Sequence, residues 1–428
     1  MNISSANRIK SFEAPSVWLE FSPLAQATNS INLGQGFPDW APPSFLQNMA
    51  IESIQGVEYS TYARSAGHLN LTKSISKNYS EQLNKDINPL TDVLVTVGAS
   101  EALFLSIMSF INEGDEVITI EPAFDIYYGA LAMAKAKTMP VSLIPSKDNL
   151  DSSADLVLDW DTLKKNLSLK TKAIILNTPH NPSGKVFSKV ELETLADILK
   201  EYPQCLIIAD EVYEHIVYDD NIHIPIASLP GMFERTISIY SAGKTFSVTG
   251  WKIGWAIGPK ELIRKLQLTQ QWVVFSVSTP HQQAISEALN TAKTPYKNYN
   301  NYYDWLKEEY TRKREILFNG LNKAGLNPIL PQGSFFILCD IKDKVIETKV
   351  THEKLFELTK DGSVQVDNAT LDLQDYNFSR HLSFNKNVTS IPASAFHIKE
   401  NQASSQGYIR FAFCKEDDVL KKAIRLLN

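Results

Sequence analysis

Residues 241–255 read Ser-Ala-Gly-Lys-Thr-Phe-Ser-Val-Thr-Gly-Trp-Lys-Ile-Gly-Trp, and they follow directly on the apolar run Thr236–Tyr240. A run that is apolar throughout predicts a strand covered on both faces of a sheet. Lys244 then lies just beyond a buried strand, where desolvation and nearby positive charge lower a lysine pKa and make the amine a carbonyl nucleophile. Lys252 supplies a second charge and Ser241 a hydroxyl donor, which suits a bound phosphate. Taken alone, the stretch fits a surface lysine better, because most lysines lie at the surface.

Other apolar runs, each followed by a polar cluster, recur along the chain. The runs predicted as strands are Asp92–Val97, Glu116–Ile120, Ala173–Leu176, Cys205–Ala209 and Thr236–Tyr240, with helices at Ser100–Phe110 and Val190–Tyr202. This order predicts an α/β fold with a mostly parallel central sheet sandwiched by helices. Ligands of such sheets bind beyond the carboxyl ends of the strands, where the polar clusters fall.

The C-terminal third has a different character. A long helical stretch is predicted from Thr279 to about Asn322, and the polar stretch Lys360–Asn387 is predicted to be a surface loop. A strand is expected at Tyr408–Cys414 and a closing helix at Asp417–Leu427. We therefore expect an N-terminal arm (1–45), a large domain (46–300) and a smaller α+β domain (301–428).

Composition excludes several classes of protein. The 428 residues carry 42 basic and 48 acidic side chains without a basic cluster, which argues against nucleic-acid binding, and 43% hydrophobic residues argue against disorder. No apolar stretch is long enough to span a membrane. Cys205, Cys339 and Cys414 are too scattered for a disulfide framework. We expect a cytosolic protein; Arg8 and Lys10 in an N-terminal segment without acids before Glu13 leave a mitochondrial presequence as the alternative.

Four common motifs are absent. Gly243-Lys244-Thr245 lacks the earlier glycine of a P-loop, since position 238 is Ser238, and the glycines of Gly34-Gln-Gly36 lack the third glycine of a dinucleotide fingerprint, since position 39 is Asp39. No zinc-type spacing of His or Cys and no G-x-S-x-G elbow occur. No metal site is expected.

Polar residues at other strand ends complement Lys244. Asp210 follows a buried strand and needs a cationic partner, such as a protonated pyridine ring. Tyr213 and Asn181 are placed to hydrogen-bond the phenolate oxygen of such a ring, although turn chemistry alone also accounts for Asn181. Gly98-Ala-Ser-Glu101 offers free N–H groups at a helix start, which suit either a phosphate or an ordinary N-cap.

The motifs together carry a family resemblance. GASEA (98–102), EPAFDIY (121–127), NTPHNPSG (177–184), ADEVYE (209–214), the 241–255 stretch and YIRFAFC (408–414) resemble, in order and spacing, the fold-type I, class I pyridoxal-phosphate aminotransferases. The resemblance runs from about Trp18 to the C-terminus. INLGQGFPD (31–39) is similar to the branch of kynurenine aminotransferases, glutamine transaminase K and cysteine-conjugate β-lyases.

The resemblance implies a role for each matching cofactor residue. Lys244 would bind pyridoxal phosphate as a Schiff base and later move a proton between substrate and cofactor. Asp210 would pair with the ring nitrogen, and Asn181 and Tyr213 with the ring oxygen. Phe124 would stack on the ring. The phosphate would be held by the N–H groups of Ser100 and Glu101 together with Ser241 and Lys252.

The resemblance also implies the substrate side of the site. Arg410 would bind the substrate α-carboxylate with two hydrogen bonds, which lysine could not do. Gly36 would offer backbone where a side chain would intrude. Trp18, Tyr62 and Phe275 would line an aromatic pocket. In the family, the residue matching Tyr62 reaches the neighbouring subunit's phosphate, which implies a homodimer with two shared sites.

Four departures from the family pattern stand out. Ser276 replaces a histidine found in some kynurenine-type relatives, and Ser100 stands where an aromatic residue can occur. Asn387 replaces a glycine, and asparagine also tolerates the left-handed conformation. The stretch Lys360–Tyr376 is an addition to which the sequence assigns no role.

The expected activity is ping-pong transamination from a large neutral or aromatic amino acid, such as kynurenine or glutamine, to a 2-oxo acid. No matched arginine would receive a side-chain carboxylate, which disfavours aspartate. The alternatives are β-elimination from a cysteine conjugate on the same cofactor, and a non-catalytic regulator built on the same fold. The segment before Gly34 is too short for an upstream DNA-binding module, and an inactive scaffold is opposed by the intact set of Lys244, Asp210, Asn181, Tyr213 and Arg410.

Overall fold

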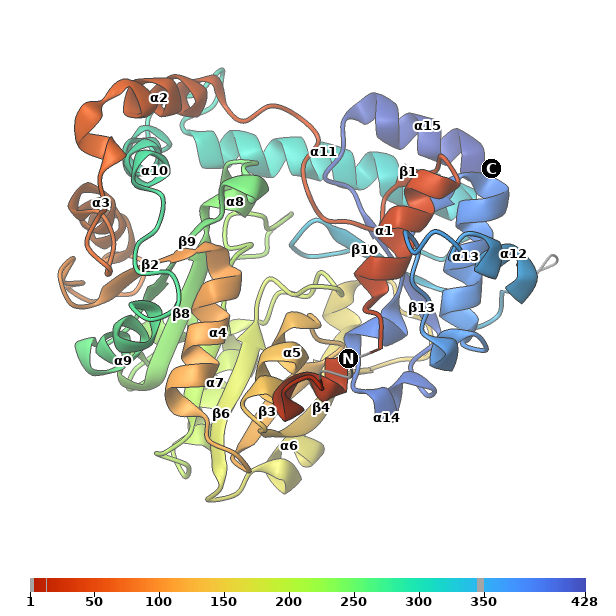
Figure 1. Cartoon of the computed structure of the whole chain (residues 1–428), viewed down its shortest axis with the longest axis horizontal. Helices are drawn as coiled ribbons and strands as arrows, with labels where there is room; N and C mark the ends of the chain where they lie inside the picture. Colours follow the sequence, from red (N-terminus) through yellow and green to blue (C-terminus); the bar gives the residue numbers. More distant parts are fainter. Residues whose placement is uncertain (1–3, 13, 345–349) are drawn as a thin grey trace.

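A large twisted sheet forms the centre of the chain in the computed structural model, which describes residues 4–12, 14–344 and 350–428 (Figure 1). Residues 1–3 and 13, on which the expectation about a presequence partly rests, lie outside the described residues. The sheet has eight strands, in the spatial order β2 (Val93–Val97), β9 (Ile253–Ile257), β8 (Thr236–Ser241), β7 (Leu206–Asp210), β6 (Thr171–Asn177), β3 (Glu116–Glu121), β4 (Lys137–Pro145) and β5 (Leu156–Leu158).

The sheet is mostly parallel, as the sequence predicts. β8, β7, β6, β3 and β4 pair in parallel, whereas β9 and β5 run antiparallel to their neighbours. The antiparallel β9 follows from a short connection, because only the single helical turn α8 (Ala242–Thr245) and a 3-10 turn separate it from β8. This connection contains Lys244.

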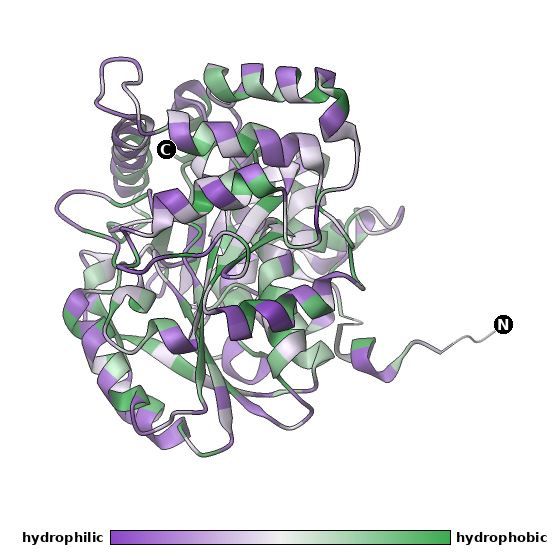
Figure 2. Cartoon of the chain, turned by 90° about the vertical axis from the view of Figure 1, so that its left-hand side faces the viewer, coloured by the Kyte–Doolittle hydropathy of each residue, from purple (hydrophilic) through white to green (hydrophobic). Residues whose placement is uncertain are grey.

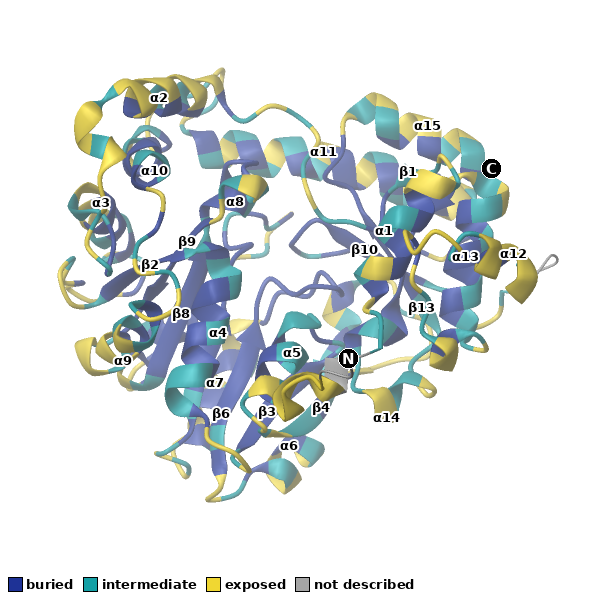
Figure 3. Cartoon of the chain, in the orientation of Figure 1, coloured by how far each residue is buried: buried dark blue, intermediate teal, exposed yellow. Residues whose placement is uncertain are grey.

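Both faces of the sheet are covered, which explains why its strands are apolar throughout. On β6, Ala173 and Ile175 face one hydrophobic cluster while Ile174 and Leu176 face another. The first cluster includes α4 (Gly98–Phe110), α5 (Ile126–Met133) and α9 (Lys260–Gln270), and the second includes α6 (Trp160–Asn166) and α7 (Lys189–Leu199). Figure 2 shows hydrophobic strands inside helices of mixed hydropathy, and Figure 3 shows the strands buried.

A second, smaller sheet lies beside the first. Its central strand β13 (Tyr408–Ala412) pairs antiparallel with β10 (Phe336–Asp340) and β12 (Ile391–Pro392). The N-terminal part of the chain joins this unit, since β1 (Ile31–Asn32) pairs with β11 (Val388–Thr389). The remaining helices are α1 (Val17–Ala27), α2 (Ser44–Gln55), α3 (Leu69–Tyr79), α10 (Thr279–Thr291), α11 (Tyr302–Lys323), α12 (His352–Glu357), α13 (Gln374–Lys386), α14 (Lys399–Gln402) and α15 (Asp417–Leu427).

The predicted continuous helix from Thr279 to Asn322 is wrong. The structure has two helices there, α10 and α11, separated by residues 292–301. Pro295 cannot continue α10, because it has no N–H to donate. The side chain of Asn301 caps α11 by accepting a hydrogen bond of 2.9 Å from the N–H of Asp304.

The predicted surface loop at Lys360–Asn387 is also partly wrong. Its second half is α13, whose Phe378 and Leu382 are buried and whose polar Arg380 is only 1% exposed. Arg380 is buried because Glu20, far away in the sequence, pairs with it through Nε–Oε1 (2.6 Å) and Nη2–Oε2 (3.1 Å) contacts. α13 ends at Asn387, which adopts the left-handed conformation (φ 51°), as expected for asparagine in place of glycine.

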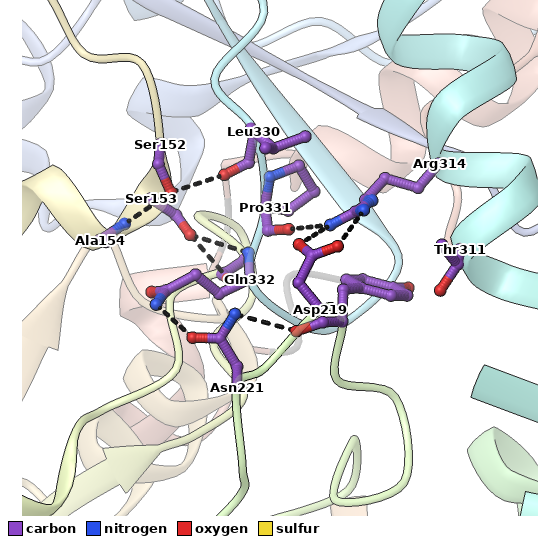
Figure 4. A network of polar contacts seen from close by, with 12 residues as sticks. Ser152, Ser153, Ala154, Asp219, Asn221, Thr311, Arg314, Leu330, Pro331 and Gln332 are labelled. Carbon is purple, nitrogen blue, oxygen red and sulfur yellow. Dashed lines mark hydrogen bonds and ion pairs between the residues drawn. The ribbon is translucent and has the colours of Figure 1, made fainter. Parts of the chain in front are cut away.

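A polar network joins α11 and the loop before β10 to the large sheet (Figure 4). Arg314 donates from Nη1 and Nη2 to the carboxylate of Asp219 at 2.7 and 2.9 Å, and Nη1 also donates to the carbonyl of Pro331 at 3.2 Å. Gln332 donates from Nε2 to Asn221 Oδ1 at 2.7 Å. These contacts hold the part of the chain that contains the small sheet in a defined position over the strand ends of the large sheet. Within the described ranges, no helix is long and apolar enough to cross a membrane.

Candidate active site

A cavity of about 300 Å³ lies beyond the carboxyl ends of the central strands, between the two sheets. Its walls include residues from β7, from the connection after β8, from the start of α4, and from β10 and β13 of the small sheet. Of the residues predicted for the site, those that line it are Trp18, Gly36, Ser100, Phe124, Asn181, Asp210, Tyr213, Ser241, Lys244, Lys252 and Arg410.

Lys244 projects into this cavity from α8. Its Nζ donates a hydrogen bond of 3.2 Å to the carbonyl of Gly36 and lies 5.1 and 5.5 Å from the ring centroids of Phe335 and Tyr213. Burial lowers the pKa of Lys244 to about 8, and the positive charge of Arg410 acts in the same direction. The amine is therefore partly neutral near pH 8, which a carbonyl nucleophile requires.

Gly36 allows the chain to approach Lys244 closely. A Cβ at this position would lie 2.5 and 2.7 Å from ring atoms of Phe336 and Phe335, so a side chain would displace both rings. These two rings require glycine at this position, whereas the approach of the Gly36 backbone to a substrate stays a prediction. In the structure its carbonyl accepts from Lys244.

Asp210 provides the negative charge of the cavity. It ends β7, is 3% exposed, and accepts a 2.5 Å hydrogen bond at Oδ2 from the hydroxyl of Tyr127. Burial raises the pKa of Asp210, whereas the hydrogen bonds from Tyr127 and from the N–H of Val212 oppose that rise. A buried carboxylate with this environment suits a partner that carries a proton, such as a protonated ring nitrogen.

Another part of the cavity lining suits an anion. α4 begins at Gly98 with a left-handed conformation (φ 69°), and a Cβ there would lie 3.1 Å from Lys252 Nζ. Gly254 packs so tightly behind this turn that its Cβ would lie 2.6 Å from the N atom of Ala99. The free N–H groups at the start of α4, the Lys252 ammonium and the Ser241 hydroxyl form a donor set that fits a phosphate.

Arg410 lies on β13 and is 1% exposed. It donates from Nη1 to Asn181 Oδ1 at 2.7 Å and from Nη2 to the carbonyl of Gly34 at 2.6 Å, while its Nε has no hydrogen-bond partner among the described residues. Burial lowers the pKa of Arg410 to about 10, which still leaves the guanidinium charged at neutral pH. Its centre lies 4.0 Å from the ring centroid of Phe336. A charged, fixed guanidinium beside an apolar wall is suited to a carboxylate.

Three predicted residues do not line the cavity. Glu101 accepts at Oε2 from the N–H of Val97 at 2.5 Å, so its side chain closes the start of α4. Tyr62 and Phe275 are 83% and 55% exposed and pack edge to face at 5.3 Å on the surface of the chain. Ser276, where some relatives have histidine, donates to the carbonyl of Ala63 at 3.0 Å.

The sequence analysis missed several residues of the cavity. Tyr127 belongs to the motif 121–127, but its contact with Asp210, 83 residues away, left no local signal. Asn177 begins the turn motif 177–184; its Nδ2 donates to the carbonyl of Asp210 at 2.8 Å, and its Oδ1 accepts from the N–H of Asn181 at 2.7 Å. No local sequence pattern indicated Phe336, because this residue lines the cavity only as a result of where β10 lies in the fold.

Comparison with known proteins agrees with the fold. A family model described as aminotransferase class I and II matches residues 28–427. The chain belongs to this aminotransferase family, with the α/β architecture of fold type I. The alternatives of a regulator and of a β-lyase are not favoured.

Individual relatives are similar to this chain over nearly its whole length. The chain is 44% identical over 417 residues to a kynurenine--oxoglutarate transaminase of Dictyostelium discoideum, covering 96% of this chain and 92% of that protein. It is 39% identical over 431 residues to human kynurenine--oxoglutarate transaminase 3, covering 100% and 90%. Among solved structures, N-succinyldiaminopimelate aminotransferase from Mycobacterium tuberculosis superposes with a TM-score of 0.84 at 33% identity, covering 99% of both chains.

Proposed function

We propose that the protein is a pyridoxal-phosphate aminotransferase that moves the amino group of a large neutral or aromatic amino acid, of the kynurenine or glutamine type, to a 2-oxo acid. The observation that carries the proposal is the convergence of Lys244, Asp210 and Arg410 on one cavity, whose lining also includes the anion-binding donor set of Ser100, Ser241 and Lys252. The names of the relatives support kynurenine as donor and oxoglutarate as acceptor.

The donor set of the cavity fits pyridoxal phosphate. The start of α4 with Ser241 and Lys252 would hold the phosphate, Asp210 the ring nitrogen, Asn181 and Tyr213 the ring oxygen, and Phe124 the ring face. When bound, the cofactor supplies an electron-withdrawing ring that stabilises negative charge at the substrate α-carbon. Lys244 is the group of this chain that can attach to its carbonyl.

Lys244 also acts as the base and acid of the reaction. Because its pKa is lowered to about 8, the amine can accept a proton at Nζ and return it at the pH of the cell. The contacts with Gly36 and the rings of Tyr213 and Phe335 restrict where Nζ can move. The same group therefore serves both halves of a ping-pong cycle.

Arg410 orients the substrate by binding its α-carboxylate, which directs the side chain toward Trp18, Phe124 and Phe336. The cations among the described lining residues are Lys244, Lys252 and Arg410. Each of these has a role in the proposal, so a side-chain carboxylate of a donor would find no further cation. The aromatic walls instead favour a bulky uncharged side chain.

A homodimer with shared sites is part of the proposal. Large apolar side chains are exposed on α2, on the segment after it, and on the turn after α9; they are Ile51, Ile54, Val57, Tyr62, Trp272, Val273 and Phe275. A patch of this kind is typical of a protein interface. Burying it against a second copy would bring Tyr62 to the partner's phosphate site, where the family resemblance puts it.

The proposal keeps the division of the chain into an arm (1–45), a large cofactor-binding domain (46–300) and a small domain (301–428). The pairing of β1 with β11 supports the association of the arm with the small domain. We place the protein in the cytosol, since its three cysteines are buried free thiols, which suit a reducing compartment.

The decisive experiment is an absorbance spectrum of the purified protein with pyridoxal phosphate, before and after kynurenine or glutamine is added alone. A visible band that shifts to the shorter wavelength of the pyridoxamine form, and that Lys244→Ala lacks, supports the first half-reaction. A band that no amino donor shifts contradicts the substrate assignment. No band at all contradicts the proposed enzyme activity. Pyruvate and ammonia formed from a cysteine conjugate without a 2-oxo acid would instead indicate β-elimination.

A further inference from the structure

Polar contacts hold α1 against the small sheet and the helices around it. Its Glu20 is paired with the buried Arg380 of α13, and the carbonyl of Leu19 accepts a 3.0 Å hydrogen bond from the N–H of Gln365. Arg380 also donates from Nη2 to Thr370 Oγ1 at 2.8 Å. Residues 360–376, to which the sequence assigned no role, therefore help to hold α1 in position through these contacts.

One side chain of α1 crosses from this unit to the large sheet. The indole Nε1 of Trp18 donates a 2.7 Å hydrogen bond to Oδ2 of Asp125, which immediately precedes α5. Trp18 lines the cavity, and so does Phe124, the residue before Asp125. The hydrogen bond thus links the two units at the wall of the substrate pocket.

Trp18 and Arg410 both stabilise the charged form of the buried Asp125 carboxylate. Burial raises its pKa, and the hydrogen bond from Trp18 and the positive charge of Arg410 oppose that rise. The guanidinium of Arg410 lies 5.7 Å from the Trp18 ring centroid, so Trp18 contacts Asp125 and also lies near the proposed carboxylate-binding group. The position of the Trp18 ring therefore depends on an acceptor supplied by the other unit.

We propose that Asp125 is a positioning residue that holds Trp18, and with it α1, against the pocket and thereby sets the preference for amino donors with bulky apolar side chains. Asp125 acts through Trp18 and not on the reacting atoms. The kinetic part of this inference rests on the proposed function, whereas its structural part does not.

The test compares Asp125→Ala, Trp18→Phe and Asp125→Asn in the cofactor-loaded protein. Alanine removes the acceptor, phenylalanine removes the donor but keeps a ring, and asparagine keeps a carbonyl oxygen as acceptor without the charge. Hydrogen exchange of a peptide covering α1 is expected to be about tenfold faster in the first two variants and close to the original rate in Asp125→Asn. Thermal unfolding checks that each variant is folded.

The kinetic measurement compares kynurenine with alanine as amino donor. In Asp125→Ala, KM for kynurenine is expected to rise about tenfold with kcat little changed. KM for alanine is expected to stay the same, because alanine has no ring that could pack against Trp18. The double variant Trp18→Phe/Asp125→Ala is expected to resemble either single variant, because both remove the same hydrogen bond.

Three results would overturn the inference: unchanged exchange of α1 in Asp125→Ala, an equal rise of KM for kynurenine and alanine, or an Asp125→Asn variant as impaired as Asp125→Ala. If the protein used neither donor but α1 still exchanged faster in Asp125→Ala and not in Asp125→Asn, the proposed function would fail while the contact between the two units would stand.

Discussion

Arg410 and Asn181, 229 residues apart in the chain, are joined by a 2.7 Å hydrogen bond from the guanidinium Nη1 to the amide Oδ1. Arg410 comes from the small sheet, and Asn181 from the turn that follows β6 of the large sheet. The group proposed to bind the substrate is therefore oriented by a residue proposed to bind the cofactor. Substrate binding and cofactor binding share one polar contact between the two units.

Arg410→Lys is expected to raise KM for every amino donor by about 10- to 100-fold, because lysine cannot offer the planar donor pair to a carboxylate. Steady-state kinetics with kynurenine and with alanine checks this, and the exposed Arg425→Lys is the matched control. A KM that rises for one donor only would mean that Arg410 contacts the side chain instead of the α-carboxylate.

Lys244→Ala is expected to abolish covalent attachment of pyridoxal phosphate. Reduction with borohydride followed by peptide mass spectrometry should find the added mass of the cofactor on the Lys244 peptide of the original protein. In the variant, no peptide should carry this added mass. Lys252→Ala is the matched control and should keep the attachment while binding the cofactor more weakly, since it removes only a phosphate contact. Attachment that survives in Lys244→Ala would contradict the assignment.

The rate of this attachment should depend on pH. Because burial lowers the pKa of Lys244 from 10.5 to about 8, the amine is protonated and unreactive at lower pH. The rate of trapping by cofactor-free protein should therefore rise about tenfold per pH unit up to pH ~8 and level off above it. A rate that keeps rising to pH ~10 would show that Lys244 has the pKa of an exposed lysine.

Tyr127→Phe is expected to weaken cofactor binding about tenfold, because it removes the hydroxyl that holds Asp210 and opposes the rise of its pKa. Equilibrium dialysis of the cofactor measures the change. The neighbouring Tyr128→Phe is the control, since the hydroxyl of Tyr128 donates to Glu121 at 3.0 Å. Equal losses in both variants would point to general damage to α5.

Glu20→Met is expected to lower the free energy of unfolding by about 3 kcal/mol, because it leaves the charge of Arg380 buried without its partner. Replacing both residues by methionine should recover most of that loss, since no unpaired charge remains. Urea unfolding of the original protein and of the two variants measures both effects. A double variant that is no more stable than Glu20→Met would show that the ion pair stabilises the fold by more than it costs to bury its two charges.

Local features of the sequence were sufficient for the large sheet. β7 and β8 were predicted within a residue or two at each end, since strands covered on both faces are apolar throughout whatever surrounds them. Lys244 and Asp210 could be singled out for the same reason, because each follows such a strand directly. Asp417–Leu427 was predicted with the bounds that the structure gives α15, owing to its regular spacing of apolar residues.

Features that depend on distant partners could not be predicted in this way. α13 was taken for a loop because its buried Arg380 resembles a surface residue until Glu20 is placed beside it. Tyr127 was missed because its importance comes from Asp210, 83 residues away. The exposure of Tyr62 and Phe275 likewise follows only from the position of the helices around them.

The sequence by itself therefore determined the α/β order and singled out Lys244 and Asp210 at strand ends, because apolar runs and the residues that end them are local properties. Only the tertiary structure decided which side chains hold those groups in place: Tyr127 on Asp210, Asn181 on Arg410, and Asp125 on Trp18. The physical reason is that a hydrogen bond depends on distances of about 3 Å between atoms, and the chain brings such atoms together only when distant segments have packed.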